Sequence, residues 1–201
     1  MIYDYTHNCK TYDAKSYTKS FFDKTRCPKC RAIGRFNLHG SYERHVAYFN
    51  AGKLVYTLIK IKRVMCKSCG TTHAVLPIDI IAYRLLSLFV MMSIFFGLYI
   101  KKIPILQIAA KLQLSFQFVY SCRDAFSRYI NLIHQFFKQT SPRQTAIMAE
   151  PNRLLPLMRE AALFQRSFIK MNQRPCFMCK FFAYGSGPPI GILTSPYASK
   201  P

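Results

Sequence analysis

Two Cys-x-x-Cys pairs constrain the fold of this chain more than any other feature. Cys27 and Cys30 form the first pair, Cys66 and Cys69 form the second, and 35 residues separate the two pairs. Two residues between thiolates allow one tight turn to present both sulfurs to a single metal ion. Two such turns complete a tetrahedral shell. The sequence therefore predicts one structural Zn²⁺ ion held by all four cysteines.

A four-sulfur shell has no open position, so we expect the ion to stabilise the fold and to activate no water. Iron in the same geometry and a redox-active dithiol are the alternatives, although a redox pair is expected beside a βαβ unit. His73 could replace a ligand, but a histidine beside a complete set is more often a hydrogen-bonding or surface residue. The third pair, Cys176 and Cys179, is interpreted as ordinary cysteines.

The composition describes a folded, strongly basic protein. Apolar residues make up 51% of the 201 residues, which is enough to build a core. Lys and Arg number 29 against eight Asp and Glu, giving a net charge of +21 that both halves of the chain share. A surface of this sign attracts polyanions or anionic lipid head groups. We find no signal-like apolar run in the first thirty residues and expect a cytoplasmic protein, in which metal binding or burial explains the cysteines better than disulfides do.

Changes of composition divide the chain into five segments and predict an α+β fold. We expect a loosely structured arm at 1–25, a β-rich zinc ribbon at 26–76, a helical domain at 77–139, a linker at 140–152, and an amphipathic helix with an irregular tail at 153–201. Within the ribbon, aromatic and β-branched runs at 42–49 and 54–64 predict a hairpin with its turn at 50–53. From Ile78 onward the pattern becomes helical.

The apolar run at 85–100 has two interpretations. Sixteen helical residues span about 24 Å, which is less than the ~30 Å of a bilayer core. The run could cross a membrane only with help from its flanks, so we favour a helix buried in a helical domain.

Helical spacing on both sides of Gln113 predicts a helix-turn-helix that ends near Gln139. Ala109 allows close helix approach, Leu112 and Leu114 fill the angle, and Ser115 can cap the second helix. Val119, Cys122 and Phe126 then face the first helix. The outward positions of the second helix are Phe116, Gln117, Tyr120, Ser121 and Asp124, with Arg123 at the edge.

The outward positions include side chains that can read base edges. Gln pairs with adenine, an aromatic ring contacts a thymine methyl, and Arg serves a guanine or a phosphate. Neighbouring basic residues would neutralise phosphates and set the register. The predicted DNA contacts are Gln117, Tyr120, Ser121, Arg123, Lys111, Arg128, Lys60, Lys62 and Arg63.

The segment around Gln113 resembles the helix-turn-helix of transposases and resolvase-like proteins, whose skeleton matches Ile108, Ala109, Leu112, Ser115 and Val119. It departs from that skeleton at Gln113, where Gly is usual, and at Phe116 and Phe118, where small polar residues are usual. Over about residues 26–130 the motifs at 27–30, 40–45 and 63–77 resemble an uncharacterised bacterial domain family found with mobile elements. The resemblance implies a zinc-ribbon, helix-turn-helix DNA-binding protein without a demonstrated activity.

The sequence does not support a catalytic site. Asp79, Asp124 and Glu160 follow the order of a transposase acid triad, but no run of central strands is available to bring them to two metal ions. We therefore expect a non-enzymatic, sequence-specific binder of double-stranded DNA, either a homodimer or a partner of a transposase. A membrane-associated zinc protein, and a ribbon that binds RNA or protein, are the rival classes.

Overall fold

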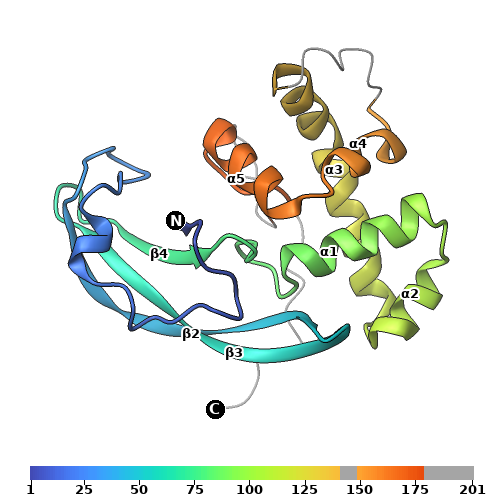
Figure 1. Cartoon of the computed structure of the whole chain (residues 1–201), viewed down its shortest axis with the longest axis horizontal. Helices are drawn as coiled ribbons and strands as arrows, with labels where there is room; N and C mark the ends of the chain where they lie inside the picture. The colour runs from blue at the N-terminus through green and yellow to red at the C-terminus, as the bar shows by residue number, and fades with distance from the viewer. Residues whose placement is uncertain (141–148, 179–201) are drawn as a thin grey trace.

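The computed structural model describes residues 1–140 and 149–178. Within these ranges the chain is an α+β protein, as predicted, with a curved sheet at one end and helices at the other (Figure 1). The sheet has the strand order β1-β4-β3-β2. Its strands are β1 (Ile2–Asp4), β2 (Phe36–Asn50), β3 (Lys53–Cys66) and β4 (Thr72–Pro77). The helices are α1 (Leu88–Phe95), α2 (Ile105–Leu112), α3 (Phe116–Thr140), α4 (Pro151–Leu157) and α5 (Ala161–Asn172).

The hairpin of β2 and β3 is the longest feature of the sheet. The two strands contain 15 and 14 residues and pair antiparallel up to Asn50 and Lys53. Ala51 (φ 45°) and Gly52 (φ 77°) both adopt left-handed backbone angles, as a two-residue type I′ turn requires. The predicted hairpin is therefore confirmed, and its strands extend further than the aromatic and β-branched runs indicated.

The first 25 residues are ordered against the sheet, and the expectation of a loosely structured arm is wrong. β1 pairs in parallel with β4, and the side chains of Tyr17 and Phe22 are 2% and 1% exposed. The hydroxyl of Tyr12 accepts a hydrogen bond from the Lys62 N–H (3.0 Å) and donates one to the Val75 carbonyl (2.8 Å). Single aromatic side chains hold this segment against the sheet. The segment has no hydrophobic periodicity, so its order could not be predicted from the sequence pattern.

Residues 78–87 are not helical, contrary to the expectation that helix begins at Ile78. Their backbone groups bond elsewhere: the Ala47 N–H donates to the Leu85 carbonyl, and the Ser87 N–H donates to the Ala47 carbonyl, both at 2.9 Å. The segment therefore runs along the free edge of β2 and links the sheet to the helices. Helix α1 begins only at Leu88.

Helix α1 lies inside the helical half, and its burial confirms the interpretation of the apolar run as a core helix. Leu88, Val90, Met91, Ile94 and Phe95 are each 0% exposed. A π-helical turn, η2 (Phe96–Ile100), continues it to the end of the run. In the ranges that the structure covers, every helix is too short or too polar to cross a membrane.

The C-terminal amphipathic piece consists of two helices rather than one. Pro156 has no N–H to donate, and α4 ends one residue later. The second helix, α5, buries Phe164 and Phe168 against Phe136 of α3. Most of the expected linker, Cys179 and the whole of the expected irregular tail lie outside the described residues.

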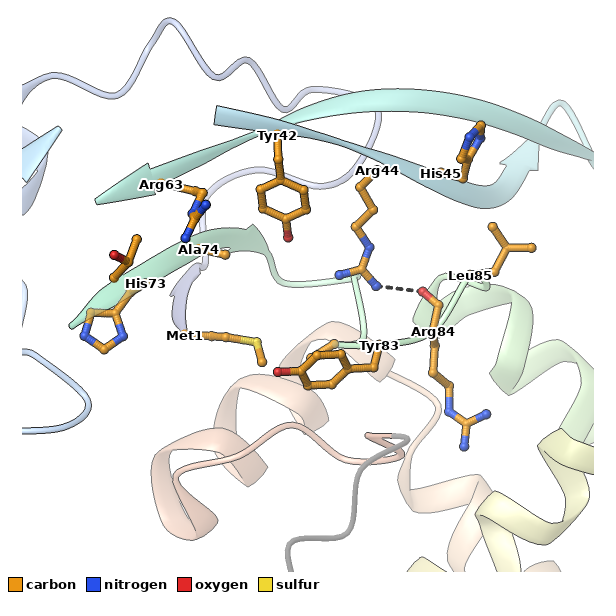
Figure 2. A pocket seen from close by; sticks show the side chains of 12 residues that line it. Met1, Tyr42, Arg44, His45, Arg63, His73, Ala74, Tyr83, Arg84 and Leu85 are labelled. Atoms are coloured by element: carbon orange, nitrogen blue, oxygen red, sulfur yellow. Dashed lines mark hydrogen bonds between the residues drawn. The ribbon is translucent and has the colours of Figure 1, made fainter. Parts of the chain in front are cut away.

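A cleft of about 650 Å³ lies between the sheet and the segment that links it to α1 (Figure 2). Arg44 of β2 reaches across to this segment. One terminal nitrogen of its guanidinium donates to the carbonyls of Ile81 and Arg84, both at 2.7 Å. The side chain thus fixes the connecting segment against the sheet.

Candidate metal centre and nucleic-acid interface

The two cysteine turns share one backbone geometry. In the first turn, the Cys27 N–H donates to the Ala32 carbonyl, and the Arg31 N–H donates to the Cys27 carbonyl. In the second turn, Cys66 pairs with Thr71 in the same way, and the Gly70 N–H donates to the Cys66 carbonyl. The residue that follows each pair has a positive φ, 64° at Arg31 and 68° at Gly70.

This repetition explains how distant cysteines acquire matching orientations. The first turn is closed by a bridge between Arg26 and Ile33, and the second turn connects β3 to β4. A glycine suits the left-handed angle at position 70, whereas Arg31 adopts the same angle at a steric cost. The left-handed backbone angle of the first turn could therefore not be predicted from its residue types.

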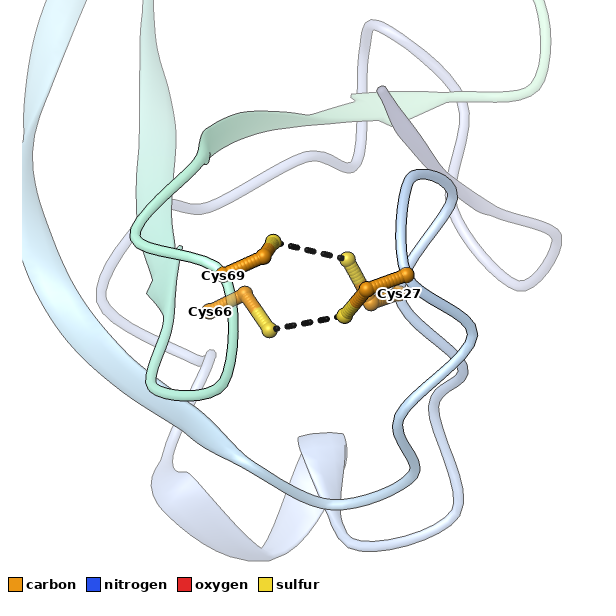
Figure 3. A group of neighbouring side chains, drawn as sticks. Cys27, Cys66 and Cys69 are labelled. Atoms are coloured by element: carbon orange, nitrogen blue, oxygen red, sulfur yellow. Dashed lines mark hydrogen bonds between the residues drawn. The ribbon is translucent and has the colours of Figure 1, made fainter.

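The structure brings the four predicted ligands together (Figure 3). Their Sγ atoms all lie within 4.8 Å of one another. The Sγ atoms of Cys27 and Cys69 are 3.8 Å apart, and those of Cys30 and Cys66 are 3.6 Å apart. Zn–S bonds of about 2.3 Å in a tetrahedron require sulfurs roughly 3.8 Å apart. The four cysteines could hold a metal ion, and their spacing is compatible with zinc.

The surroundings of the second turn favour thiolates, because the pKa values of Cys66 and Cys69 are both lowered. Hydrogen bonds from Thr71 lower the pKa of Cys69 to about 6. His73 is buried, with its Nε2 3.3 Å from the Cys27 sulfur. Burial lowers the pKa of His73 to about 4, so near neutral pH its ring is uncharged and can donate one hydrogen bond to that sulfur. The cysteines form a complete set, so His73 fits a supporting role, as the sequence indicated.

Helices α2 and α3 meet through a three-residue turn. Gln113 adopts a left-handed conformation (φ 52°, ψ 40°), and the Leu114 N–H donates to the Ala109 carbonyl at 2.9 Å. This 6→1 bond is the mark of a Schellman motif. The Ser115 hydroxyl accepts a hydrogen bond from the Phe118 N–H (3.3 Å), which confirms its predicted cap.

The predicted outward positions of α3 are accessible. Val119, Cys122 and Phe126 are 0–1% exposed and pack into the helical core. On the opposite side, Gln117 and Tyr120 are exposed and Ser121 is half-buried. Of the basic contacts predicted nearby, Lys111 and Arg128 are exposed.

Arg123 and its neighbours form an aromatic and cationic ladder that the sequence did not reveal. The Arg123 guanidinium lies 4.6 Å from the centroid of the Tyr120 ring, and the Phe116 and Tyr120 rings meet edge to face at 6.2 Å. Arg123 also contacts the Asp124 carboxylate at 3.4 Å. Phe116 and Tyr120 are four residues apart, and Tyr120 and Arg123 are three apart. These spacings place the side chains side by side on a helix and were the signal available in the sequence.

The basic residues of β3 do not share one surface. Lys60 and Lys62 lie on the same face because side chains alternate along a strand, and Arg63 lies on the other. Arg63 lines the cleft of Figure 2, together with Tyr42 and Arg44. The three β3 residues grouped by sequence therefore point to two different surfaces.

The three carboxylates of the transposase-like order also lie apart. Asp79 is buried beside Cys9 in the connecting segment, Asp124 is exposed on α3, and Glu160 precedes α5. Among the residues that the structure covers, the cysteine cluster is the group placed to share a metal ion.

The fold and the cluster define an α+β protein with four cysteines placed so that they could hold a metal ion. Residues 22–104 match a family model described as "Domain of unknown function (DUF6431)". The matched residues contain both cysteine turns, the hairpin and α1, and they end before α2, so α2 and α3 lie outside the match. Neither a curated protein nor a solved structure matches the chain.

Proposed function

We propose that this protein is a sequence-specific binder of double-stranded DNA, associated with mobile elements, in which one Zn²⁺ ion has a structural role. Helix α3 enters the major groove, and basic side chains on α2 and α3 contact phosphates. The protein has no catalytic site of its own and works as a homodimer or beside a transposase.

The geometry of α2 and α3 carries the proposal. The Schellman turn at Gln113 and the cap at Ser115 fix the angle between the helices, while Val119 and Cys122 anchor α3 in the core. The first turns of α3 therefore present Gln117 and Tyr120 to solvent on a rigid support. A rigid helix whose exposed N-terminal half carries hydrogen-bonding and aromatic side chains suits readout of base edges. A net charge of +21 supplies the attraction for a polyanion.

Zinc suits the donor set because four thiolates in a tetrahedral arrangement are its usual structural site. The bound centre would carry a charge of about −2, and the exposed Lys29, Arg31 and Lys67 lie on the two turns that hold it. Zn²⁺ would cross-link the two turns and do no chemistry, because the four thiolates leave no position for a water or substrate.

Selection from a random pool of duplexes tests the proposal. Purified protein with stoichiometric zinc is expected to enrich a defined motif, and its affinity should fall ~10³–10⁵-fold between 50 and 200 mM salt if six to ten phosphates are engaged. Binding without an enriched motif, or with equal affinity for single-stranded RNA, would refute specific duplex readout.

Paired variants separate base readout from phosphate contact. Gln117→Ala should weaken binding to the enriched duplex by ~1–3 kcal/mol and leave binding to random duplexes nearly unchanged. The control is Lys111→Gln, which should weaken both alike. An equal loss on every sequence with Gln117→Ala would remove this residue from base recognition.

A further inference from the structure

The cleft between the sheet and the connecting segment has no role in duplex recognition by α3. Its sheet side includes Tyr42, Arg44 and Arg63, and the opposite side is formed by residues 82–85. Its volume of about 650 Å³ falls within the ~300–1,000 Å³ typical of small-molecule sites. A unit of a single strand fits such a space, whereas a duplex does not.

The cleft is basic, and its residues include no Asp or Glu. It is lined by Met1, Tyr42, Arg44, His45, Arg63, Thr72, His73, Ala74, Ala82, Tyr83, Arg84 and Leu85. Figure 2 shows the Arg84 guanidinium turned away from the cleft, and its Nε donates to the Phe177 carbonyl at 2.6 Å. Among the side chains, Arg44 and Arg63 therefore supply the positive charge of the cleft.

Arg44 is held in place before any ligand arrives. Its two hydrogen bonds to backbone carbonyls involve one terminal nitrogen. The other terminal nitrogen lies on the side of Tyr42 and Arg63 (Figure 2). A guanidinium that is already ordered loses little freedom when it binds an anion, and its planar fork suits phosphate.

Two tyrosines add exposed aromatic surface to this basic cleft. Tyr42 is 37% exposed and Tyr83 is 51% exposed. Tyr83 adopts a φ of 62°, a left-handed conformation that is unfavourable for a bulky residue. Such strain often occurs at binding sites, where it fixes a side chain in a required position. Aromatic rings beside arginines are the common means by which proteins hold unpaired bases.

We propose that this cleft binds one phosphate-bearing nucleotide unit of a single nucleic-acid strand. Arg44 and Arg63 hold the phosphate, and Tyr42 and Tyr83 stack against the base. The site is independent of α3, so it stands whether or not the protein reads duplex DNA.

A short labelled oligonucleotide tests the site. The probe is a 5′-phosphorylated thymidine tetranucleotide, which cannot form a duplex, and fluorescence anisotropy with the zinc-loaded full chain measures its affinity. Arg63→Gln is expected to weaken binding about tenfold at constant salt, because it removes a charge-assisted contact to phosphate. Lys53→Gln is the matched control: it removes one charge from the far end of the same strand and should change the affinity less than about twofold.

Further measurements test whether the base stacks on Tyr42 and exclude the competing explanations. Tyr42→Leu should weaken binding at least about fivefold through lost stacking, while Tyr42→Phe should preserve it. Thymidine monophosphate should compete with the probe, and inorganic phosphate should compete far less well. Equal losses with Arg63→Gln and Lys53→Gln would show attraction to the general charge and overturn the proposal. Loss of tetranucleotide binding in Gln117→Ala would place the probe on α3 and would also overturn it, as would equal competition by inorganic phosphate.

Discussion

At the scale of a single residue, Asp4 shows how one buried carboxylate can hold a segment of the chain in place. It is 1% exposed, and its carboxylate accepts hydrogen bonds from the Thr6 backbone (2.8 Å) and from the Tyr17 hydroxyl, and contacts His7 Nδ1 at 2.6 Å. Burial alone would raise its pKa, but the hydrogen bonds from Thr6, Tyr17 and His7 outweigh burial and lower the pKa of Asp4. The carboxylate thus ties the N-terminal segment to the sheet.

Replacing Asp4 should cost stability in a pH-dependent way. Asp4→Asn is expected to lower the free energy of unfolding by about 2 kcal/mol at pH 7. Because the folded-state pKa lies below the unfolded value of ~3.9, the stabilisation is present above that value and is lost as the pH falls through the folded pKa. Urea unfolding at pH 7 and pH 3 should therefore show the difference between the two proteins shrinking in acid. Asp23→Asn, on an exposed carboxylate, should show little difference at either pH.

Gln113 gives a second prediction at this scale, because glycine should be more stable at its left-handed angle. Gln113→Gly is expected to raise the free energy of unfolding by up to about 1 kcal/mol. The same change at Gln107, an exposed position inside α2, should lower it by about 1 kcal/mol. Thermal unfolding of both variants checks the opposite signs. A loss of stability in both would mean that the Gln113 side chain makes a contribution larger than its backbone strain.

At the scale of an element, the start of α3 depends on its cap. Ser115→Ala removes the acceptor for the Phe118 N–H and should lower the free energy of unfolding by about 1 kcal/mol, while Ser115→Asp should preserve it. Ser127 is the comparison, because its hydroxyl donates to a carbonyl one turn back within α3, so Ser127→Ala should be nearly neutral. Chemical denaturation of the three variants decides whether the cap or the loss of any serine hydroxyl matters.

The elements that could be predicted are those whose information is local. The Gly52 turn and its flanking strands, and the spacing on both sides of Gln113, specify the hairpin and the two helices without reference to the rest of the chain. The N-terminal segment and residues 78–87 were not predicted correctly, because their hydrogen bonds are made to residues far away in the sequence. Tyr12 bonds to β3 and β4, and Ala47 of β2 pairs with the connecting segment.

The same distinction applies to the candidate sites. Two Cys-x-x-Cys turns identify four candidate metal ligands because the spacing within each pair is itself a geometric constraint. The cleft has no such signature, since Tyr42, Arg63 and Tyr83 come from three separate parts of the chain. The pairing of β2 with β3 and the anchoring of the connecting segment by Arg44 bring them together.

At the scale of the whole molecule, the helical half and the region around the cysteine turns have very different cores. The helical half contains a large continuous cluster of buried residues that joins α1, α3, α4 and α5. The region around the cysteine turns has a small one, which includes Ile2, Phe22, Phe36 and two of the four cysteines. A core of that size is expected to need a cross-link, and structural zinc supplies ~10–16 kcal/mol of apparent binding free energy in small domains.

Removing the metal should therefore unfold the region around the cysteine turns before the helical half. With a chelator at pH 7, hydrogen exchange is expected to become fast at Cys66 to Gly70 and along β4, while amides of α3 around Phe126 remain protected. Elemental analysis should find one zinc per chain before chelation, and added Zn²⁺ should restore slow exchange. Cys30→Ser should abolish stoichiometric zinc, whereas Cys122→Ser, the same substitution in the helical core, should retain it. If chelation leaves exchange at the second cysteine turn unchanged, the hydrophobic cluster alone is sufficient to hold this region, and the ion is not required for its fold.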